Sequence, residues 1–276
     1  MPKKKVVIVG DGKRNEVVKA IKALRPLVES SARLLAIDLK QQINLEKVKA
    51  DLVLVFGGDG SILEVARRLG RNQVSVAGIN LGKFGFLAEF SLEEIRGDIK
   101  GLLAGSFRPR GRLMLNCRIR RGREVRKKSL ALNDAVISGS GPSRMLYINL
   151  KINGEAVTIF RGDGLIVATP VGSTAHSLSA GGPILVPGME GFIISPICPH
   201  TLANRPLVVS SDCKLLLNVP SPSSGVILTL DGQVYLKINP QDRIEITKAD
   251  QYFQLVETGR RTYYQTLREK LHWEKR

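Results

Sequence analysis

Cysteine, histidine and the common nucleotide-binding fingerprints are scarce or absent in this 276-residue sequence. The three cysteines, Cys117, Cys198 and Cys213, are odd in number and widely spaced, which fits neither a disulfide framework nor a metal knuckle. The three histidines never lie three or four residues apart, so no metal-ligating residues are predicted. The patterns G-x-x-x-x-G-K-[ST] and G-x-G-x-x-G are missing, which removes the ordinary P-loop and Rossmann-fingerprint interpretations.

Long hydrophobic runs and acidic residues are also few. No apolar run approaches the ~18 residues that would span a bilayer, and the run after Met1–Lys5 is too short for a signal peptide. We therefore expect a soluble, cytoplasmic protein with no membrane partner. Only 25 Asp and Glu stand against 42 Lys and Arg, which gives a net charge of +17. This excess attracts nucleotides, polyphosphates and nucleic acid alike.

The first part of the chain alternates apolar strands with helical patterns, as a parallel α/β sheet does. Beyond a basic, breaker-rich stretch at 108–112, short β-type segments separated by Gly, Pro, Asn and Asp favour an antiparallel sandwich or barrel. Strands are expected at 6–9, 34–37, 52–56, 74–79, 113–119, 130–137, 146–152, 165–169, 215–219, 226–230, 234–238 and 244–247, and helices at 17–24, 62–69, 92–103 and 262–273.

This pattern predicts an α/β plus all-β protein. A Rossmann-like α/β domain occupies residues 1–112, and a β-rich sandwich domain occupies residues 113–250. The segment 251–276 is expected to carry a C-terminal helix and to pack back on the first domain.

One carboxylate and three glycines follow the expected strand 52–56, in Gly57–Gly58–Asp59–Gly60. Ligands bind at such carboxyl ends of parallel strands. The glycines let backbone N–H groups approach a phosphate, and Ser61 is expected to cap the next helix. Asp59 is unfavourable beside phosphate unless it accepts a proton, binds a cation or orients a hydroxyl, so we interpret it as catalytic. The alternative is an ordinary Asp-Gly turn with a capping serine.

Two polar segments interrupt the second half of the chain. From Asp163 to Pro183, a strand leads into a Pro-Gly turn and a Ser/Thr-rich helix start, whose hydroxyl and N–H groups could read adenine edges and ribose oxygens. Simple helix capping would explain one of these hydroxyls. Asn133–Asp134 interrupts a strand pattern, either to grip the vicinal hydroxyls of a ribose or as a bulge or edge position.

The segment from Arg108 to Lys128 holds ten Lys or Arg residues and the single acid Glu124. It is expected to form a hairpin with Arg121–Gly122 at its tip. A solvated hairpin is favoured over a polyanion or RNA contact, because no aromatic residues are interleaved. Nucleic acid is therefore not expected as a partner.

Five motifs occur in the order and spacing seen in NAD kinases, which the sequence resembles over most of its length. They are Gly57–Gly60, Asn133–Asp134, Asp163–Pro183, Pro196–His200 and Asp231–Gln233. The resemblance implies an enzyme that transfers a phosphoryl group from ATP or polyphosphate, with Mg²⁺ or another divalent cation, to the adenosine 2′-hydroxyl of NAD. It also implies a homodimer or homotetramer with nucleotides as its small-molecule ligands.

The resemblance also implies residue roles. Asp59 would accept the proton, in the loop of Gly57, Gly58 and Gly60. An ordinary carboxylate is too weak a base to ionise a ribose hydroxyl in advance, so the proton would move late. The residues implied to hold the dinucleotide are Asn133, Asp134, Arg161, Asp163, Thr174, Ala175, His176, Ser177, Leu178 and Ser179 and, at positions with more variable surroundings, Arg144 and Gln233.

Three residues depart from the pattern usual in the family: Asp134 replaces glutamate, His176 replaces tyrosine and Ser61 replaces threonine. Altered affinity or selectivity is expected from these changes. The Gly-Gly-Asp-Gly element is shared with phosphofructokinases and lipid kinases, so a lipid or sugar kinase is the alternative enzyme, although residues 174–179 argue against it. A non-catalytic nucleotide- or RNA-binding protein would explain the charge but would leave Asp59 without a task.

Overall fold

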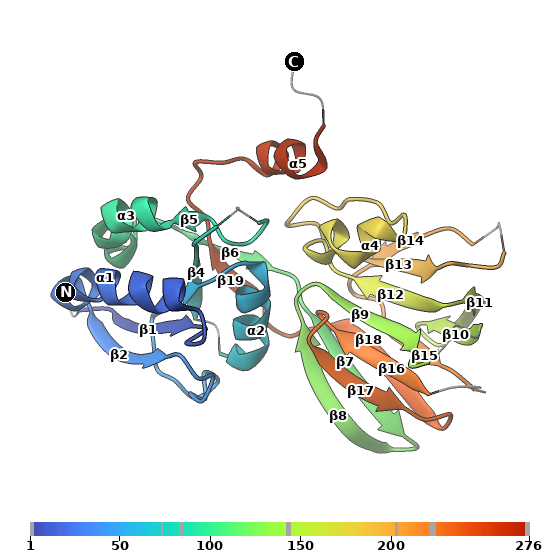
Figure 1. Cartoon of the computed structure of the whole chain (residues 1–276). Coiled ribbons are helices and arrows are strands. Elements are labelled where there is room, and N and C mark those ends of the chain that lie inside the picture. Colours follow the sequence, from blue (N-terminus) through green and yellow to red (C-terminus); the bar gives the residue numbers. More distant parts are fainter. Residues whose placement is uncertain are drawn as a thin grey trace. The chain divides into compact units, whose positions relative to one another are not determined.

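The structure is a computed structural model that describes residues 3–72, 74–82, 85–141, 145–201, 204–220 and 225–273 (Figure 1). The chain forms two compact units, Met1–Gly111 with Phe253–Arg276, and Arg112–Tyr252. The first unit is thus built from both ends of the sequence. Within the described ranges, no helix is both long enough and apolar enough to cross a membrane.

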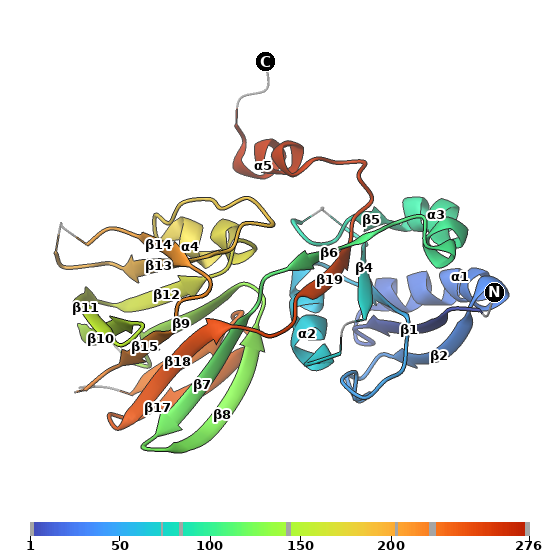
Figure 2. The same ribbon diagram turned by 180° about the vertical axis from the view of Figure 1, so that it is seen from behind.

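The first unit is built on a sheet whose strands are mostly parallel. Across the sheet the order is β2 (Arg33–Asp38), β1 (Lys5–Gly10), β3 (Leu52–Phe56), β4 (Ser75–Asn80), β19 (Phe253–Val256) and β6 (Pro109–Arg112), with β5 (Phe90–Ser91) beside β4. Figure 2 shows β6 and β19 side by side, so the strand that leaves this unit and the strand that returns to it are neighbours.

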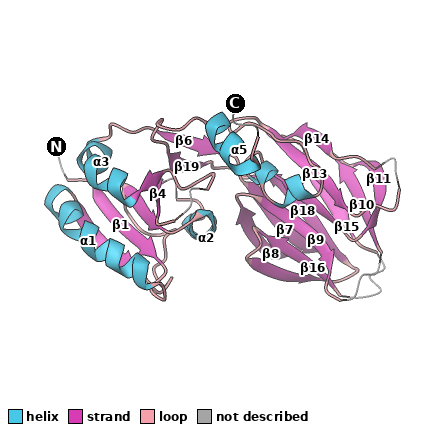
Figure 3. Ribbon diagram, turned by 45° about the horizontal axis from the view of Figure 1, so that its top comes forward, coloured by secondary structure: helices cyan, strands magenta, loops and turns pink. Residues whose placement is uncertain are grey.

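Helices cover both faces of this sheet. On one face, α1 (Asn15–Ser31) and α3 (Leu92–Ala104) bury their apolar sides against alternate residues of the central strands, such as Ile8 and Leu54 (Figure 3). On the other, Ile62 of α2 (Asp59–Leu69) reaches Gly78 of β4, where an added Cβ would lie 2.4 Å from its side chain. The central strands are therefore buried on both faces, which is why they appear in the sequence as continuous apolar runs. The chain ends in α5 (Tyr263–Leu271).

The second unit consists of two antiparallel sheets. The first has the order β11 (Glu155–Gly162), β10 (Leu146–Ile152), β15 (Leu215–Asn218), β18 (Asp242–Lys248), β7 (Leu115–Arg121) and β8 (Glu124–Ala131). The second has the order β14 (Leu207–Ser210), β13 (Gly191–Ile197), β12 (Gly164–Ala168), β9 (Asp134–Gly139), β16 (Val226–Leu230) and β17 (Val234–Ile238).

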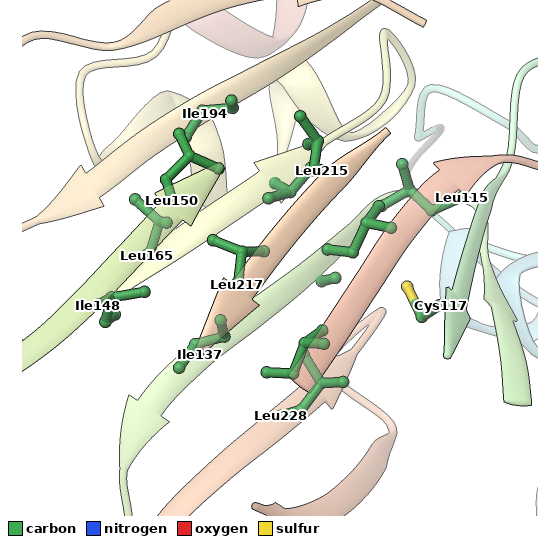
Figure 4. Packing of buried hydrophobic residues seen from close by; sticks show 14 of the residues in the cluster. Leu115, Cys117, Ile137, Ile148, Leu150, Leu165, Ile194, Leu215, Leu217 and Leu228 are labelled. Atoms are coloured by element: carbon green, nitrogen blue, oxygen red, sulfur yellow. The ribbon is translucent and has the colours of Figure 1, made fainter. Parts of the chain in front are cut away.

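Both sheets contribute alternate residues to one core, in which Leu115, Ile148 and Leu217 of the first sheet pack with Ile137 and Leu228 of the second (Figure 4). A shared core between two sheets is the definition of a sandwich. The opposite face of β12 has a smaller cluster of its own, in which Ile166 packs with Leu185 from the polar segment that follows the strand. The expected α/β plus β-rich architecture is confirmed.

Two local expectations are wrong, and one strand was not expected. The strand expected at 130–137 is two strands, because β8 ends at Ala131 and β9 starts at Asp134 in the other sheet. The breaker-rich stretch at 108–112 contains strand β6, whose hydrogen-bonded neighbour comes from the far end of the chain. The basic hairpin turns at Gly122–Arg123, one residue beyond the expected tip, and Asp242 and Glu245 of β18 pair with several of its arginines.

Candidate active site

The Asp59 carboxylate lies at the start of α2, directly after β3, and is held by the loop that follows β4. Its Oδ2 accepts a hydrogen bond from the Phe86 N–H at 2.8 Å, and its Oδ1 accepts from the Leu87 and Ala88 N–H groups at 3.1 and 3.2 Å. Three donors fix the orientation of an ionised carboxylate. These residues were not among the expected site residues. The signal that could have found them is that β3 and β4 are parallel neighbours, whose carboxyl ends meet.

The glycines around Asp59 leave an open backbone turn. A Cβ at Gly57 would lie 2.3 Å from the Ser61 hydroxyl oxygen, so this position has no room for a larger residue. Gly58 has open space around it, and Gly60 is exposed. The expectation that Ser61 caps α2 is wrong, because Gly58 is the N-cap and Ser61 lies within the first turn. The turn is suited to the close approach of a phosphate group.

A second cluster surrounds Asn133 and Asp134, in the second unit. The Asp231 carboxylate, between β16 and β17, accepts hydrogen bonds from three successive N–H groups: Leu132 at 3.1 Å, Asn133 at 2.7 Å and Asp134 at 3.3 Å. In return, the Asp231 N–H donates to the Asp134 carbonyl at 3.0 Å. Asp231 therefore anchors the predicted ribose-binding pair. Its motif was noted in the sequence, but this role was not expected, because Asp231 lies 97 residues after Asp134 in the chain.

Burial gives Asn133 and Asp134 unusual chemistry. The Asn133 Oδ1 atom is buried and has no hydrogen-bond partner among the described residues, so it is an acceptor that a ligand donor would satisfy. Asp134 is only 4% exposed, and burial, followed by the charge of Asp231, raises the pKa of its carboxyl to about 7. Near neutral pH, Asp134 is therefore found both as a carboxylate that only accepts and as an acid that also donates.

The polar segment after β12 is attached to the same strand ends. Thr169 donates its hydroxyl to the Leu132 carbonyl at 2.6 Å and its N–H to the Asn133 carbonyl at 2.9 Å. The short helices η1 (Gly172–Thr174) and α4 (His176–Ser179) follow. Three segments that are distant in the sequence, at 132–134, 169–172 and 231, therefore converge.

Some side chains of this segment are bonded within the protein, and others are exposed. The Ser177 side chain is fully buried, and its hydroxyl shares a 3.0 Å hydrogen bond with the Ser195 hydroxyl. The Thr174 hydroxyl donates to the Val171 carbonyl at 3.2 Å. These hydroxyls stabilise the turn. His176 and Ser179 are exposed, while Ala175 and Leu178 are half-buried, so these four residues keep surface that a ligand can reach.

Gly172 is the contact at which this segment meets Asn133. A Cβ there would lie 2.1 Å from the Asn133 carbonyl oxygen, which is a backbone atom and cannot rotate away. We expect Gly172→Ala to lower the free energy of unfolding by about 1–3 kcal/mol, because overpacking forces the backbone apart. Denaturant titrations would measure the effect. Gly97→Ala in α3, where an added Cβ meets nothing within 4 Å, is the control and should stabilise the chain slightly. Equal stability changes in the two variants would contradict the packing argument.

The remaining predicted residues lie at other places in the second unit. Arg161 in β11 is exposed, with its guanidinium 5.6 Å from the centre of the Tyr147 ring. Asp163 is half-buried between β11 and β12, and its N–H donates to the Ile197 carbonyl at 2.9 Å. Gln233 is exposed in the turn that carries Asp231. Arg144 lies outside the described residues.

Within the described ranges, no group of three or more His, Cys, Asp or Glu side chains could hold a metal ion.

Two family models match the chain. The model described as the ATP-NAD kinase N-terminal domain matches residues 7–107, and the model described as the ATP-NAD kinase C-terminal domain matches residues 132–258. An NAD kinase of Rhodopirellula baltica is 43% identical over 269 residues, which cover 98% of this chain and 86% of that protein. An NAD kinase of Geotalea daltonii is 42% identical over 228 residues, which cover 83% of this chain and 80% of that protein.

Solved structures show the same architecture. Yeast NADH kinase, crystallised with NADH, superimposes with a TM-score of 0.84 at 24% identity and covers 100% of this chain and 89% of its own, which establishes likeness of fold alone. An NAD kinase from Archaeoglobus fulgidus, in complex with ATP, gives a TM-score of 0.77 at 27% identity, over 98% of this chain and 100% of its own.

Proposed function

Because the chain belongs to the NAD kinase family, we infer that it transfers the terminal phosphoryl group of ATP to NAD and produces NADP. In this reaction the bond between the terminal phosphorus and the bridging oxygen of ATP breaks, and a bond from phosphorus to the 2′-oxygen of the adenosine ribose forms. The hydroxyl proton leaves, and ADP is released. Positioning and charge neutralisation are the main contributions that such a transfer needs from a protein.

We propose that Asp59 orients the 2′-hydroxyl and accepts its proton late in the transfer. The observation that carries this role is its carboxylate, fixed by three N–H groups beside an open glycine turn at the end of β3. The turn of Gly57, Gly58 and Gly60 would offer its backbone to the phosphates of the donor. Orientation of the hydroxyl then matters more than the basicity of the carboxylate.

The second unit would hold the dinucleotide. The buried, unpartnered Asn133 Oδ1 fits the amino group of adenine, and Asp134 fits the ribose hydroxyls. The residues Thr174, Ala175, His176, Ser177, Leu178 and Ser179 would form the turn around the adenosine, with Ser177 acting through the position of the turn. Arg161 and Asp163, together with Arg144 and Gln233, would meet the rest of NAD.

A divalent cation such as Mg²⁺ would enter with ATP, bound by its phosphate oxygens, and would neutralise charge on the transferring group. Polyphosphate remains an alternative donor. The expected domains divide this work: residues 1–112 carry the glycine turn, residues 113–250 bind NAD, and residues 251–276 support the first domain.

The protein would act as a homodimer or homotetramer in the cytoplasm. Exposed apolar side chains of the second unit support self-association: Ile159 on the outer strand β11, Tyr147 on its neighbour β10, and Leu207 and Val208 on the outer strand β14. Light scattering after gel filtration would measure the assembly. The free thiols fit a reducing compartment.

The direct test of the function is incubation of the purified chain with ATP, Mg²⁺ and NAD, followed by enzymatic detection of NADP. Parallel reactions should replace ATP with polyphosphate and NAD with NADH, a sphingoid base, diacylglycerol or fructose 6-phosphate. NADP formation that depends on both substrates is the expected result. Phosphorylation of a lipid or sugar, with none of NAD, would reject the assignment.

A further inference from the structure

We propose that the C-terminal segment Thr258–Tyr263 is a clamp that positions the Asp59 carboxylate by fixing the loop of Phe86–Glu89. The inference rests on the proposed role of Asp59 and adds positioning residues to it, namely Thr258, Arg261 and Tyr263. All the contacts that carry it lie within the first unit.

The first step links Asp59 to the loop. Three successive loop amides donate to the carboxylate, so a displacement of the loop backbone displaces the carboxylate with it. At Gly85 an added Cβ would lie 2.2 Å from each oxygen of the Asp59 carboxylate, so the loop backbone lies too close to this carboxylate to leave space for a methyl group. Helix α2 holds the Asp59 backbone, and the loop holds its side chain.

The second step links the loop to the C-terminal segment. Glu89 Oε2 accepts hydrogen bonds from both the N–H and the hydroxyl of Thr258, each at 3.1 Å. The Glu89 carbonyl accepts a hydrogen bond from Arg261 at 3.2 Å, and the same guanidinium bonds Glu94 of α3 at 3.0 Å. Arg261 therefore fastens the loop to the start of a helix that packs on the sheet.

A ring contact completes the clamp. The Phe86 ring, on the residue whose N–H makes the shortest bond to Asp59, lies 6.2 Å from the Tyr263 ring, centre to centre. Tyr263 is the first residue of α5, whose start is fixed by a capping box between Thr262 and Gln265. The segment itself is anchored in the sheet, because β19 pairs with β4, the strand that precedes the loop.

The neighbouring arginine provides a matched control. Arg260 has the same side chain and lies on the same segment, but it pairs with Asp98 of α3 at 2.8 Å. Removing either guanidinium loses an ion pair with α3, whereas removing that of Arg261 also releases the Glu89 carbonyl. The two substitutions therefore separate general weakening of the tail from loss of the clamp.

The test measures steady-state kinetics and amide hydrogen exchange in the full chain. Arg261→Gln should lower kcat about tenfold and leave the KM for NAD within about twofold, while Arg260→Gln leaves both within about twofold. Arg261→Lys should restore part of kcat, because an ammonium can also donate to a carbonyl. Thr258→Val keeps the shape of the side chain but removes the hydroxyl that donates to Glu89 and accepts from the Arg260 N–H, and it should lower kcat about threefold. The amides of Phe86, Leu87 and Ala88 should exchange about tenfold faster in Arg261→Gln than in Arg260→Gln.

Equal kcat values in the two arginine variants, or unchanged exchange at residues 86–88, would overturn the clamp. The double variant Asp59→Asn with Arg261→Gln should be no slower than Asp59→Asn alone, because the clamp acts through that carboxylate. A full additional loss would show that Arg261 acts elsewhere. If Asp59→Asn alone left turnover unchanged, the proposed role of Asp59 would fail, and the exchange measurement would still decide whether the segment orders the loop.

Discussion

Replacing Asp59 with asparagine should lower kcat by at least about 10²-fold and leave the KM for NAD within about threefold of its original value. An amide cannot accept the hydroxyl proton in the way a carboxylate can. It also brings an NH₂ group against one side of the loop, where the N–H groups of Phe86, Leu87 and Ala88 are all donors. The residues proposed to bind NAD belong to the other unit, so ground-state affinity should change little.

Asp38 offers a control for the loss of a buried, amide-bound carboxylate. It lies at the end of β2 and accepts hydrogen bonds from the N–H groups of Lys40, Gln42 and Ile43 at 3.3, 3.0 and 3.2 Å, as Asp59 does from three amides, and it also pairs with the Arg68 guanidinium. Asp38→Asn should reduce stability by about 1–3 kcal/mol and leave kcat within about twofold at a temperature where the variant is folded. If both variants lost turnover equally, the effect would be structural. Unchanged turnover in Asp59→Asn would remove Asp59 from the mechanism.

The strands predicted best from the sequence are those with a continuous or a regularly alternating pattern of buried residues. The apolar runs at 52–56 and 226–230 match β3 and β16 residue for residue, because every side chain of β3 is buried and β16 alternates cleanly. Some of the missed strands are polar, although the largely buried strands β13 and β19 were missed as well. Strand β8 carries five successive exposed residues, and β11 has an apolar pattern interrupted by exposed positions. Both are outer strands, where pairing with a neighbour rather than side-chain burial decides the conformation.

Only part of the candidate site, likewise, could be predicted from the sequence. Asp59 could be predicted, because a lone acid among glycines after an apolar strand is a local pattern. Its three donors are backbone amides, which have no side-chain signature. Asn133–Asp134 could be singled out as unfavourable strand residues, yet the Asp231 carboxylate that holds their backbone N–H groups lies 97 residues from Asp134 in the sequence. The local pattern did not predict that the Ser177 hydroxyl is buried and shares a hydrogen bond with the Ser195 hydroxyl, because that partner lies on another strand.

Asp134→Asn should make the protein more stable above neutral pH, at the expense of NAD affinity. In the folded chain, burial and then the Asp231 charge raise the pKa of Asp134 to about 7 from an ordinary value of 3.8. The folded state thus retains a proton that the unfolded state releases between these values. The stabilisation linked to this proton is complete below about pH 4 and is lost as pH rises through about 7. The loss lowers the free energy of unfolding by at most about 4 kcal/mol. An asparagine never ionises and avoids this loss.

Urea titrations of the parent and Asp134→Asn at pH 5, 6.5 and 8 would measure the effect. The variant should gain about 1–3 kcal/mol over the parent at pH 8, and the gain should shrink towards pH 5, where the parent carboxyl is protonated. The buried Cys117 thiol adds no pH dependence to the stability in this range, because burial and the charges of Asp231 and Asp134 raise its pKa far above it. Asp250→Asn, at an exposed position, is the control and should show no such trend. A gain that is the same at all three pH values would mean that Asp134 does not titrate in this range, and the variant would then owe its stability to packing alone.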